Sequence, residues 1–147
     1  MNGVVLALIT SLSTISAAAL GFWSSYLIQR KSQKQKLIDS ILGKRMSTYS
    51  EALNFVYQIE QNQAKADALD KIVDGWKKWY PSNAAYLPPS VNAAFFGAMI
   101  WAVPVSVDLH NAQVNIKTTS RFIEFVQDAK TKLLGLEDIG WLPEDLK

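Results

Sequence analysis

The first 29 residues carry no charged side chain, and this feature constrains the fold more than any other in the sequence. Within it, the run at residues 4–28 is 25 residues long. As an α-helix it would extend about 37 Å, against roughly 30 Å for the hydrocarbon core of a bilayer. Its hydroxyl residues can bond back to helix carbonyls and are tolerated in lipid. The run predicts a transmembrane helix, with residues 1–29 as a membrane anchor.

A cleaved secretory signal and a buried helix of a soluble protein are the alternatives. A signal peptide starts with basic residues and has a shorter apolar stretch. Here no Lys or Arg precedes the run, and residues 20–28 stay uncharged beyond the small residues at 17–19. A buried helix would have to account for the position of every charged residue, 15 basic and 13 acidic, beyond residue 29. Both alternatives are weaker than an anchor.

A basic juxtamembrane segment at residues 30–36 sets the predicted orientation. Its four basic residues precede the first acid, Asp39, so the positive-inside rule places the C-terminal body in the cytoplasm. Aromatic rings just before this segment favour the headgroup level of a bilayer. The predicted membrane-interface residues are Phe22, Trp23, Tyr26, Arg30, Lys31 and Lys34. We therefore expect a single-pass protein of the inner membrane, in contact with lipid.

Small residues recur every four positions within the predicted span, at Ser13, Ala17, Gly21 and Ser25. This spacing places them on one slowly drifting stripe of a helix, where a second helix can approach closely. The stripe is a candidate helix–helix interface, with another copy or with a different protein. Small residues are also common in membrane helices that make no such contact.

The body at residues 37–135 is predicted to be a small antiparallel bundle of three to four helices, so the fold class is all-α. A helix over residues 33–62 has apolar residues at the spacing of a packed seam, with Lys44 and Arg45 among its polar positions. A second helix has one apolar face and should end at Pro81. A last helix over residues 118–134 should stop at Gly135. The expected inward residues are Leu42, Met46, Tyr49, Leu53, Val56, Leu69, Ile72, Val73, Trp76, Tyr80, Phe122, Phe125, Val126, Ala129 and Leu133.

The segment at residues 79–116 is unusual because Asp108 is its only charged residue. Residues 91–103 are predicted to form a helix that is apolar on nearly all sides, and Pro104 should kink or end it. Residues 105–114 either continue as a helix or form irregular chain. Such a helix is either central in the bundle or covered by another protein. A second span or re-entrant insertion over residues 91–107 is the alternative, disfavoured by short length and the lack of a basic flank.

The tail at residues 136–147 places apolar residues between acids. It is either a solvated end that packs loosely or a short docking peptide. Together with the third helix it supplies the candidate partner-binding residues, which are Phe95, Phe96, Met99, Trp101 and Trp141.

No catalytic, cofactor-binding or metal site is predicted. The chain has no cysteine, which excludes disulfides, thiolate metal sites and cysteine nucleophiles. His110 is the only histidine, so a multi-histidine zinc site is impossible, and a Ser-His-Asp triad could use only His110 beside Asp108. No phosphate-binding loop motif occurs. A net charge of +2 does not indicate nucleic acid, and the basic segment beside a span favours anionic lipid. No small-molecule substrate is indicated.

The stretch Lys44-Arg45-Met46-Ser47-Thr48-Tyr49-Ser50-Glu51, the pair Trp79-Tyr80 and the run Leu87-Pro88-Pro89-Ser90-Val91 resemble features of a loose class of small bacterial proteins of uncharacterised function. These proteins have an N-terminal span, a basic juncture and a short helical bundle. The resemblance implies that fold and no activity. The nearly uncharged third helix departs from the class, where more amphipathic patterning is expected.

These features predict a membrane-anchored, non-catalytic accessory or scaffold subunit of a bacterial inner-membrane assembly, or a homo-oligomer, acting through helix–helix contacts. The alternative is a membrane-perturbing effector of the toxin or defence type, whose apolar third helix inserts in the bilayer.

Overall fold

The computed structural model describes the backbone of residues 2–113 and 115–141, and side chains within these ranges from residue 23 onward. The described chain is helical and contains no strand. Its elements are α1 (Asn2–Gln61), α2 (Ala66–Asn83), the short 3₁₀-helix η1 (Ala84–Tyr86), α3 (Pro89–His110) and α4 (Ile116–Leu134). The predicted all-α class is confirmed.

The chain divides into two units, residues 1–40 and 41–147, and α1 contributes to both. Helix α1 passes through the basic segment at 30–36 and through Gly43 without interruption. One helix therefore runs through residues 2–61, and a lone glycine such as Gly43 is tolerated within it. The predicted boundaries of the anchor, the basic segment and the body stay predictions, because a continuous helix is compatible with them.

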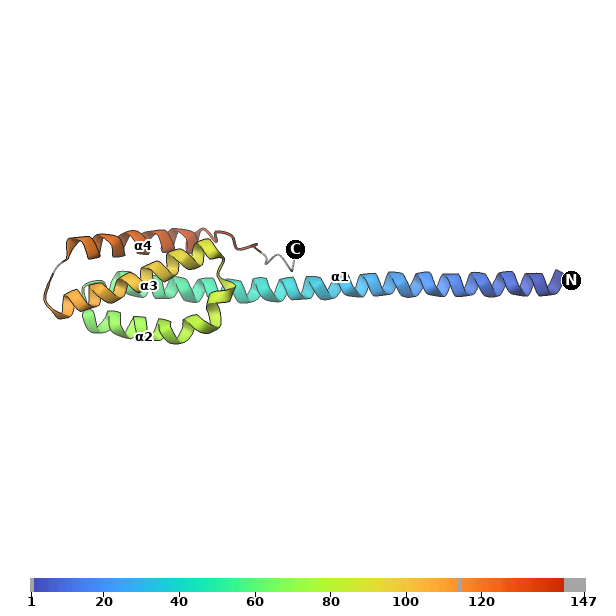
Figure 1. The fold of residues 1–147 in the computed structure, drawn as a ribbon, viewed down its shortest axis with the longest axis horizontal. Coiled ribbons are helices and arrows are strands. Elements are labelled where there is room, and N and C mark those ends of the chain that lie inside the picture. The colour runs from blue at the N-terminus through green and yellow to red at the C-terminus, as the bar shows by residue number, and fades with distance from the viewer. Residues whose placement is uncertain (1, 114, 142–147) are drawn as a thin grey trace. The chain divides into compact units, whose positions relative to one another are not determined.

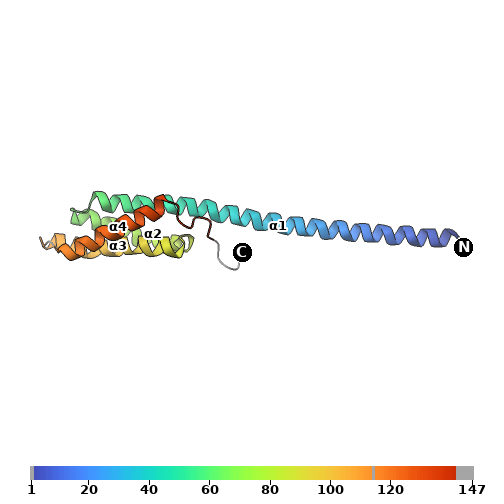
Figure 2. The same cartoon turned by 90° about the horizontal axis from the view of Figure 1, so that it is seen from above.

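The second unit is a four-helix bundle. The last part of α1 lies alongside α2, α3 and α4, and successive helices run in opposite directions (Figures 1 and 2). Helix α3 packs against both α2 and α4. One cluster of buried side chains from all four helices forms the core. The predicted antiparallel bundle is confirmed.

The amphipathic faces of α2 and α4 were predicted correctly. Leu69, Ile72, Val73 and Trp76 of α2 are buried, as are the predicted α4 residues other than Phe125, which is half-buried. The face of α1 was partly wrong: Met46 is half-exposed, whereas Arg45 is 1% exposed.

Pro81 and Pro104 both lie within helices. This contradicts the predicted end of the second helix at Pro81, whereas a helix that continues beyond Pro104 is one of the two outcomes that the sequence left open. Pro81 lies in the last turn of α2, which continues to Asn83, and the Asn83 side chain donates to the Trp79 carbonyl at 2.9 Å. Pro104 lies inside α3, which continues to His110. A proline costs a helix one hydrogen bond and a clash with the preceding turn. Buried residues before and after Pro104, among them Ala102 and Val105, hold both parts of α3 in the core.

Helix α4 begins two residues earlier than predicted because Asn115 caps it. The Asn115 side chain accepts hydrogen bonds from the backbone amides of Lys117 and Thr118, at 3.1 and 3.3 Å. Asparagine is among the best residues for satisfying these first helical donors. The helix ends at Leu134, with Gly135 next, as the sequence predicted.

Residues 136–141 are not a loose end. Arg45 of α1 donates to the carbonyls of Ile139 (3.0 Å) and Trp141, and the Tyr49 hydroxyl donates to the carbonyl of Glu137. Ser90 at the start of α3 donates to Asp138 at 2.7 Å. These bonds tie three alternate carbonyls of the segment to the bundle.

One helix in the described part is long and apolar enough to cross a membrane by length and composition, and it is α3, with a mean hydropathy of 1.6. Core helices of soluble proteins have the same property, and 44% of the most apolar stretch is buried in this fold. The predicted N-terminal span falls largely on residues 1–22, whose side chains lie outside the described residues. The membrane anchor at residues 1–29 therefore stays a prediction.

Candidate interaction surface

Helix α3 packs against α2 and α4 through the buried part of its surface. Its buried positions include an alanine at every fourth residue, Ala94, Ala98 and Ala102. Short side chains allow neighbouring helices to approach closely. At Gly97 the approach is so close that an added Cβ would collide with the Phe125 ring of α4.

The remaining side of α3 faces solvent and is apolar. The exposed positions of the helix are spaced by four and three residues in alternation, and they are Pro89, Ala93, Phe96, Ile100, Val103, Val107 and His110. This is the spacing of the seam along which two helices pack. We call the five apolar residues from Ala93 to Val107 the outer stripe. No charged side chain lies in it.

Aromatic rings fix the edges of the outer stripe. The Phe96 ring lies 5.5 Å from those of Trp76 and Tyr80 in α2, measured between ring centroids. On the other edge, Trp101 stacks on Phe125 at 6.4 Å with an interplanar angle of 16°. Contacts of this kind stabilise particular ring positions. The stripe is therefore a preformed surface, flanked by rings held in place by α2 and α4.

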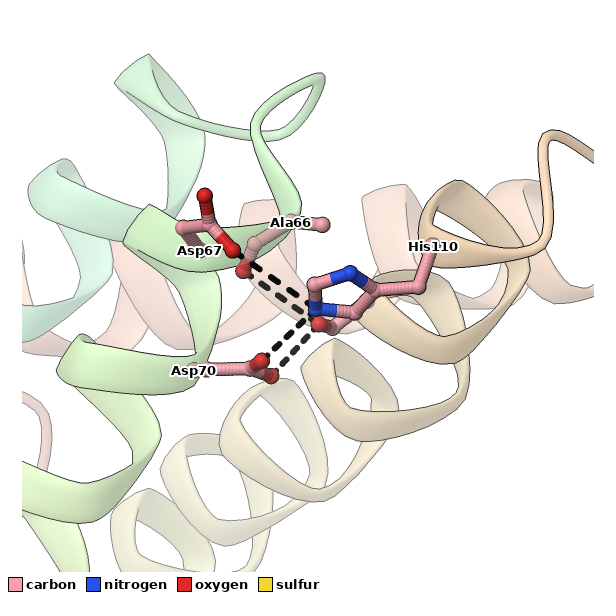
Figure 3. A network of polar contacts seen from close by, with 5 residues as sticks. Ala66, Asp67, Asp70 and His110 are labelled. Atoms are coloured by element: carbon pink, nitrogen blue, oxygen red, sulfur yellow. Dashed lines mark hydrogen bonds and ion pairs between the residues drawn. The ribbon is translucent and has the colours of Figure 1, made fainter.

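A polar cluster closes the C-terminal end of the stripe (Figure 3). His110 Nε2 lies 2.8 Å from Asp70 Oδ2 and 4.0 Å from Asp67 Oδ1 in α2. The hydroxyl of Ser106 donates to the other oxygen of Asp70 at 2.5 Å and lies 3.3 Å from the carbonyl oxygen of Ala66. These hydrogen bonds, first from Ser106 and then from His110, lower the pKa of Asp70.

The order of groups in this cluster differs from that of a hydrolytic triad. Asp70 lies between Ser106 and His110, so the imidazole does not contact the hydroxyl it would have to deprotonate. The sequence had paired His110 with Asp108, and this is corrected: His110 pairs with Asp70 of α2. The cluster joins α2 to α3.

A second polar site surrounds Arg45. Its guanidinium also donates to the carbonyl of Tyr86 at 3.0 Å and lies 5.4 Å from the ring centroid of Trp141. Burial lowers the pKa of Arg45 and raises the pKa of Tyr49 to about 12. Carbonyl oxygens thus replace the water around a buried cation. The site fastens η1 and residues 136–141 to α1.

Among the residues whose side chains the structure describes, no three His, Asp or Glu side chains lie close enough to hold a metal ion. A cavity of about 280 Å³ opens between the α1–α2 loop, α3 and α4, lined by apolar residues such as Phe122 and by Asp108. The buried Oδ2 of Asp108 has no hydrogen-bond partner.

The sequence-predicted site residues fall into three groups. Ser13, Ala17, Gly21 and Phe22 lie outside the residues whose side chains are described, while Trp23, Ser25, Tyr26, Arg30, Lys31 and Lys34 are exposed on α1. Phe95 and Met99 are fully buried and belong to the core, so they form no surface. Trp101 and Trp141 are half-buried, and Phe96 lies in the outer stripe.

Four stripe residues, Ala93, Ile100, Val103 and Val107, were missed. A helix that is apolar all round gives no contrast between its faces. The alanines at 94, 98 and 102 were the available signal, because they mark the side on which neighbouring helices come close.

The chain matches no protein-family model, and no curated protein or solved structure is similar enough to count as a match.

Proposed function

We propose that this protein is a membrane-anchored, non-catalytic interaction subunit, held in the inner membrane by its N-terminal helix and making protein contacts through α3. The observation that carries the proposal is the outer stripe. Its large members, Phe96, Ile100, Val103 and Val107, are 41, 43, 39 and 51% exposed. An apolar patch of this regularity on a folded surface marks an interaction site.

The anchor rests on the uncharged run at residues 4–28 and on the aromatic and basic residues near its end. Trp23 and Tyr26 are exposed on α1, close before the basic residues from Arg30 onward. Rings and cations in this order favour the cytoplasmic headgroup layer of a bilayer. The positive-inside rule then favours a cytoplasmic body.

Membrane fractionation tests the anchor. The full-length protein should stay in the membrane pellet after washing with high salt and with alkaline carbonate. A Leu12→Arg variant should lose this retention, because residue 12 lies near the middle of the predicted span, where a charge is costly. The matched Leu12→Ile variant should keep it. Release of the unaltered chain by carbonate would contradict the proposal.

Cross-linking in native membranes tests the contact. A photo-reactive residue at Ile100 should give a discrete cross-linked product, whereas one at exposed Lys78 of α2 should not. A stripe that yields no product, on a chain that is strictly monomeric in the membrane, would count decisively against the proposed function.

A second candidate function is membrane perturbation by insertion of α3, favoured by the length and hydropathy of that helix. Insertion would remove Phe95 and Met99 from the core and break the bond between Ser106 and Asp70. It predicts dye leakage from vesicles containing anionic lipid, abolished by Val103→Asp. Intact vesicles at high protein concentration would exclude it.

A further inference from the structure

We infer that the occupant of the outer stripe is the same stripe of a second copy of this chain, so that the protein forms a dimer through α3. The inference rests on the proposed function, since it names the partner of the same surface. The inference goes beyond the proposed function because it specifies a symmetric contact between two copies.

The pattern of the stripe complements itself. The intervals from Phe96 to Ile100 to Val103 to Val107 are four, three and four residues, and they read the same in either direction. An identical stripe therefore matches it layer by layer whether the two α3 helices run parallel or antiparallel. In a parallel pair, Ile100 and Val107 take the positions where β-branched residues favour two-stranded packing.

Charge does not oppose the contact. Two identical surfaces bring every charge against its own kind, so a surface that pairs with itself has to be nearly neutral. The outer stripe has no charged residue over its five positions, and Asp67 and Asp70 at its end lie beside His110. Asp108 follows Val107 in the chain, and its Oδ2 is buried. Asp70 is already engaged with His110 and Ser106.

The area of the stripe favours a partner that shares its membrane. The exposed fractions of its four large residues correspond to roughly 300 Å² of apolar surface per copy, taking about 150–200 Å² for a large side chain in full exposure. A standard stable interface uses about 800 Å² per partner. A contact of this size is weak between freely diffusing proteins, and confinement of both partners raises their effective concentration. A second copy is anchored in the same membrane by construction.

Cysteine cross-linking of the full-length protein in native membranes tests the inference, because the chain has no cysteine of its own. Single Ile100→Cys and Val103→Cys variants should form disulfide-linked dimers under mild oxidation. If the two α3 helices are parallel, each variant should cross-link to itself. If they are antiparallel, cross-linking should occur mainly when the two variants are mixed. Ile123→Cys is the matched control. Ile123 is an equally exposed apolar residue on α4, and it lies beside Glu60 of α1 and Gln63 of the α1–α2 loop rather than on the stripe.

A second measurement does not depend on disulfide geometry. The mass of the protein in lipid nanodiscs should be that of a dimer, and Val103→Asp should weaken the dimer at least tenfold, whereas Ile123→Asp should not. Both substitutions lie at exposed positions, and retained helicity by circular dichroism shows that the fold is intact.

Three results would overturn the inference: equal cross-linking at Ile123, a monomeric mass, or stripe cross-links that go only to a different protein. The last result would leave the proposed function standing, because the stripe would still be an interaction surface. Release from membranes by carbonate would remove the proposed anchor, whatever the cross-links show.

Discussion

Replacing Arg45 by methionine should destabilise the bundle and free residues 136–141. Methionine keeps much of the volume of the side chain and removes all of its donors. In the structure these donors reach the carbonyls of Tyr86 and Ile139, each at 3.0 Å, and of Trp141. Arg45 is thus the one side chain in the described bundle that links α1, η1 and the segment after α4.

The expected loss combines two opposing effects. A buried acceptor left without a partner costs about 1–3 kcal/mol, and three carbonyls are affected. In the variant the desolvation penalty of the buried guanidinium is absent, and the carbonyls of the freed segment can form hydrogen bonds with water. Both effects reduce the loss. We expect Arg45→Met to lower the free energy of unfolding by about 2–4 kcal/mol. Arg45→Lys keeps the charge but cannot span three carbonyls, so we expect a loss of about 1–2 kcal/mol.

Urea unfolding of the full-length protein in mild detergent, followed by helicity, measures this loss. Hydrogen exchange at residues 136–141 should accelerate in the same variants. Arg121→Met is the matched control, because Arg121 is exposed and bonds only Glu124, one turn away; its effect should stay below about 1 kcal/mol. If Arg45→Met were as stable as the wild type, with unchanged exchange at 136–141, the assigned role of the guanidinium would be refuted.

Three further predictions concern single side chains. The pKa of Tyr49 is raised to about 12 from an ordinary value near 10, so its neutral form stabilises the fold below pH 10. The free energy of unfolding should fall by up to about 2.7 kcal/mol between pH 10 and 12. In urea melts at a series of pH values, Tyr49→Phe should lack this fall. Gly97→Ala should lower the free energy of unfolding by about 1–3 kcal/mol, because the added Cβ would collide with the Phe125 ring. Gly75→Ala is the control, because its Cβ would lie 3.6 Å from the Phe55 ring, at ordinary contact distance; it should be neutral or stabilising in the same urea melts. The lowered pKa of Asp70 stabilises the fold above pH 4, so the difference in unfolding free energy between wild type and Asp70→Asn should shrink as pH falls below 4.

The helices with two contrasting faces could be predicted well from the sequence. In α2 and α4 the apolar residues recur with the period of a helix and polar residues fill the other face, so the pattern alone fixes which side is buried. Trp76 and Phe122 were placed correctly for this reason.

The face of α1 was harder because its buried side includes a cation. Arg45 was assigned to the polar face and Met46 to the buried face, a rotation of one residue from the structure. Hydropathy favours that assignment. Arg45 is buried because its guanidinium binds the carbonyls of Ile139 and Trp141. These residues lie more than 90 positions away in the sequence, so no local pattern reveals the contact.

The proline positions show a similar limit. Whether the helix continues beyond Pro104 could not be decided from the sequence, since proline removes one hydrogen bond and crowds the previous turn. Packing of Val105 and the bond from Ser106 to Asp70 hold the following turn in helical form. Tertiary contacts thus outweigh a local preference.

The outer stripe is more apolar than the bundle itself requires. Stability of the bundle needs the inner positions of α3 to be apolar and sets no such condition on Phe96, Ile100, Val103 and Val107, where polar residues would leave the core intact and reduce aggregation. All four are nevertheless large and apolar. Lipid could cover such a surface, but an anionic bilayer disfavours the carboxylates of Asp67 and Asp70 at its end. Under the proposed function, a protein partner that packs along the stripe accounts for its apolar composition.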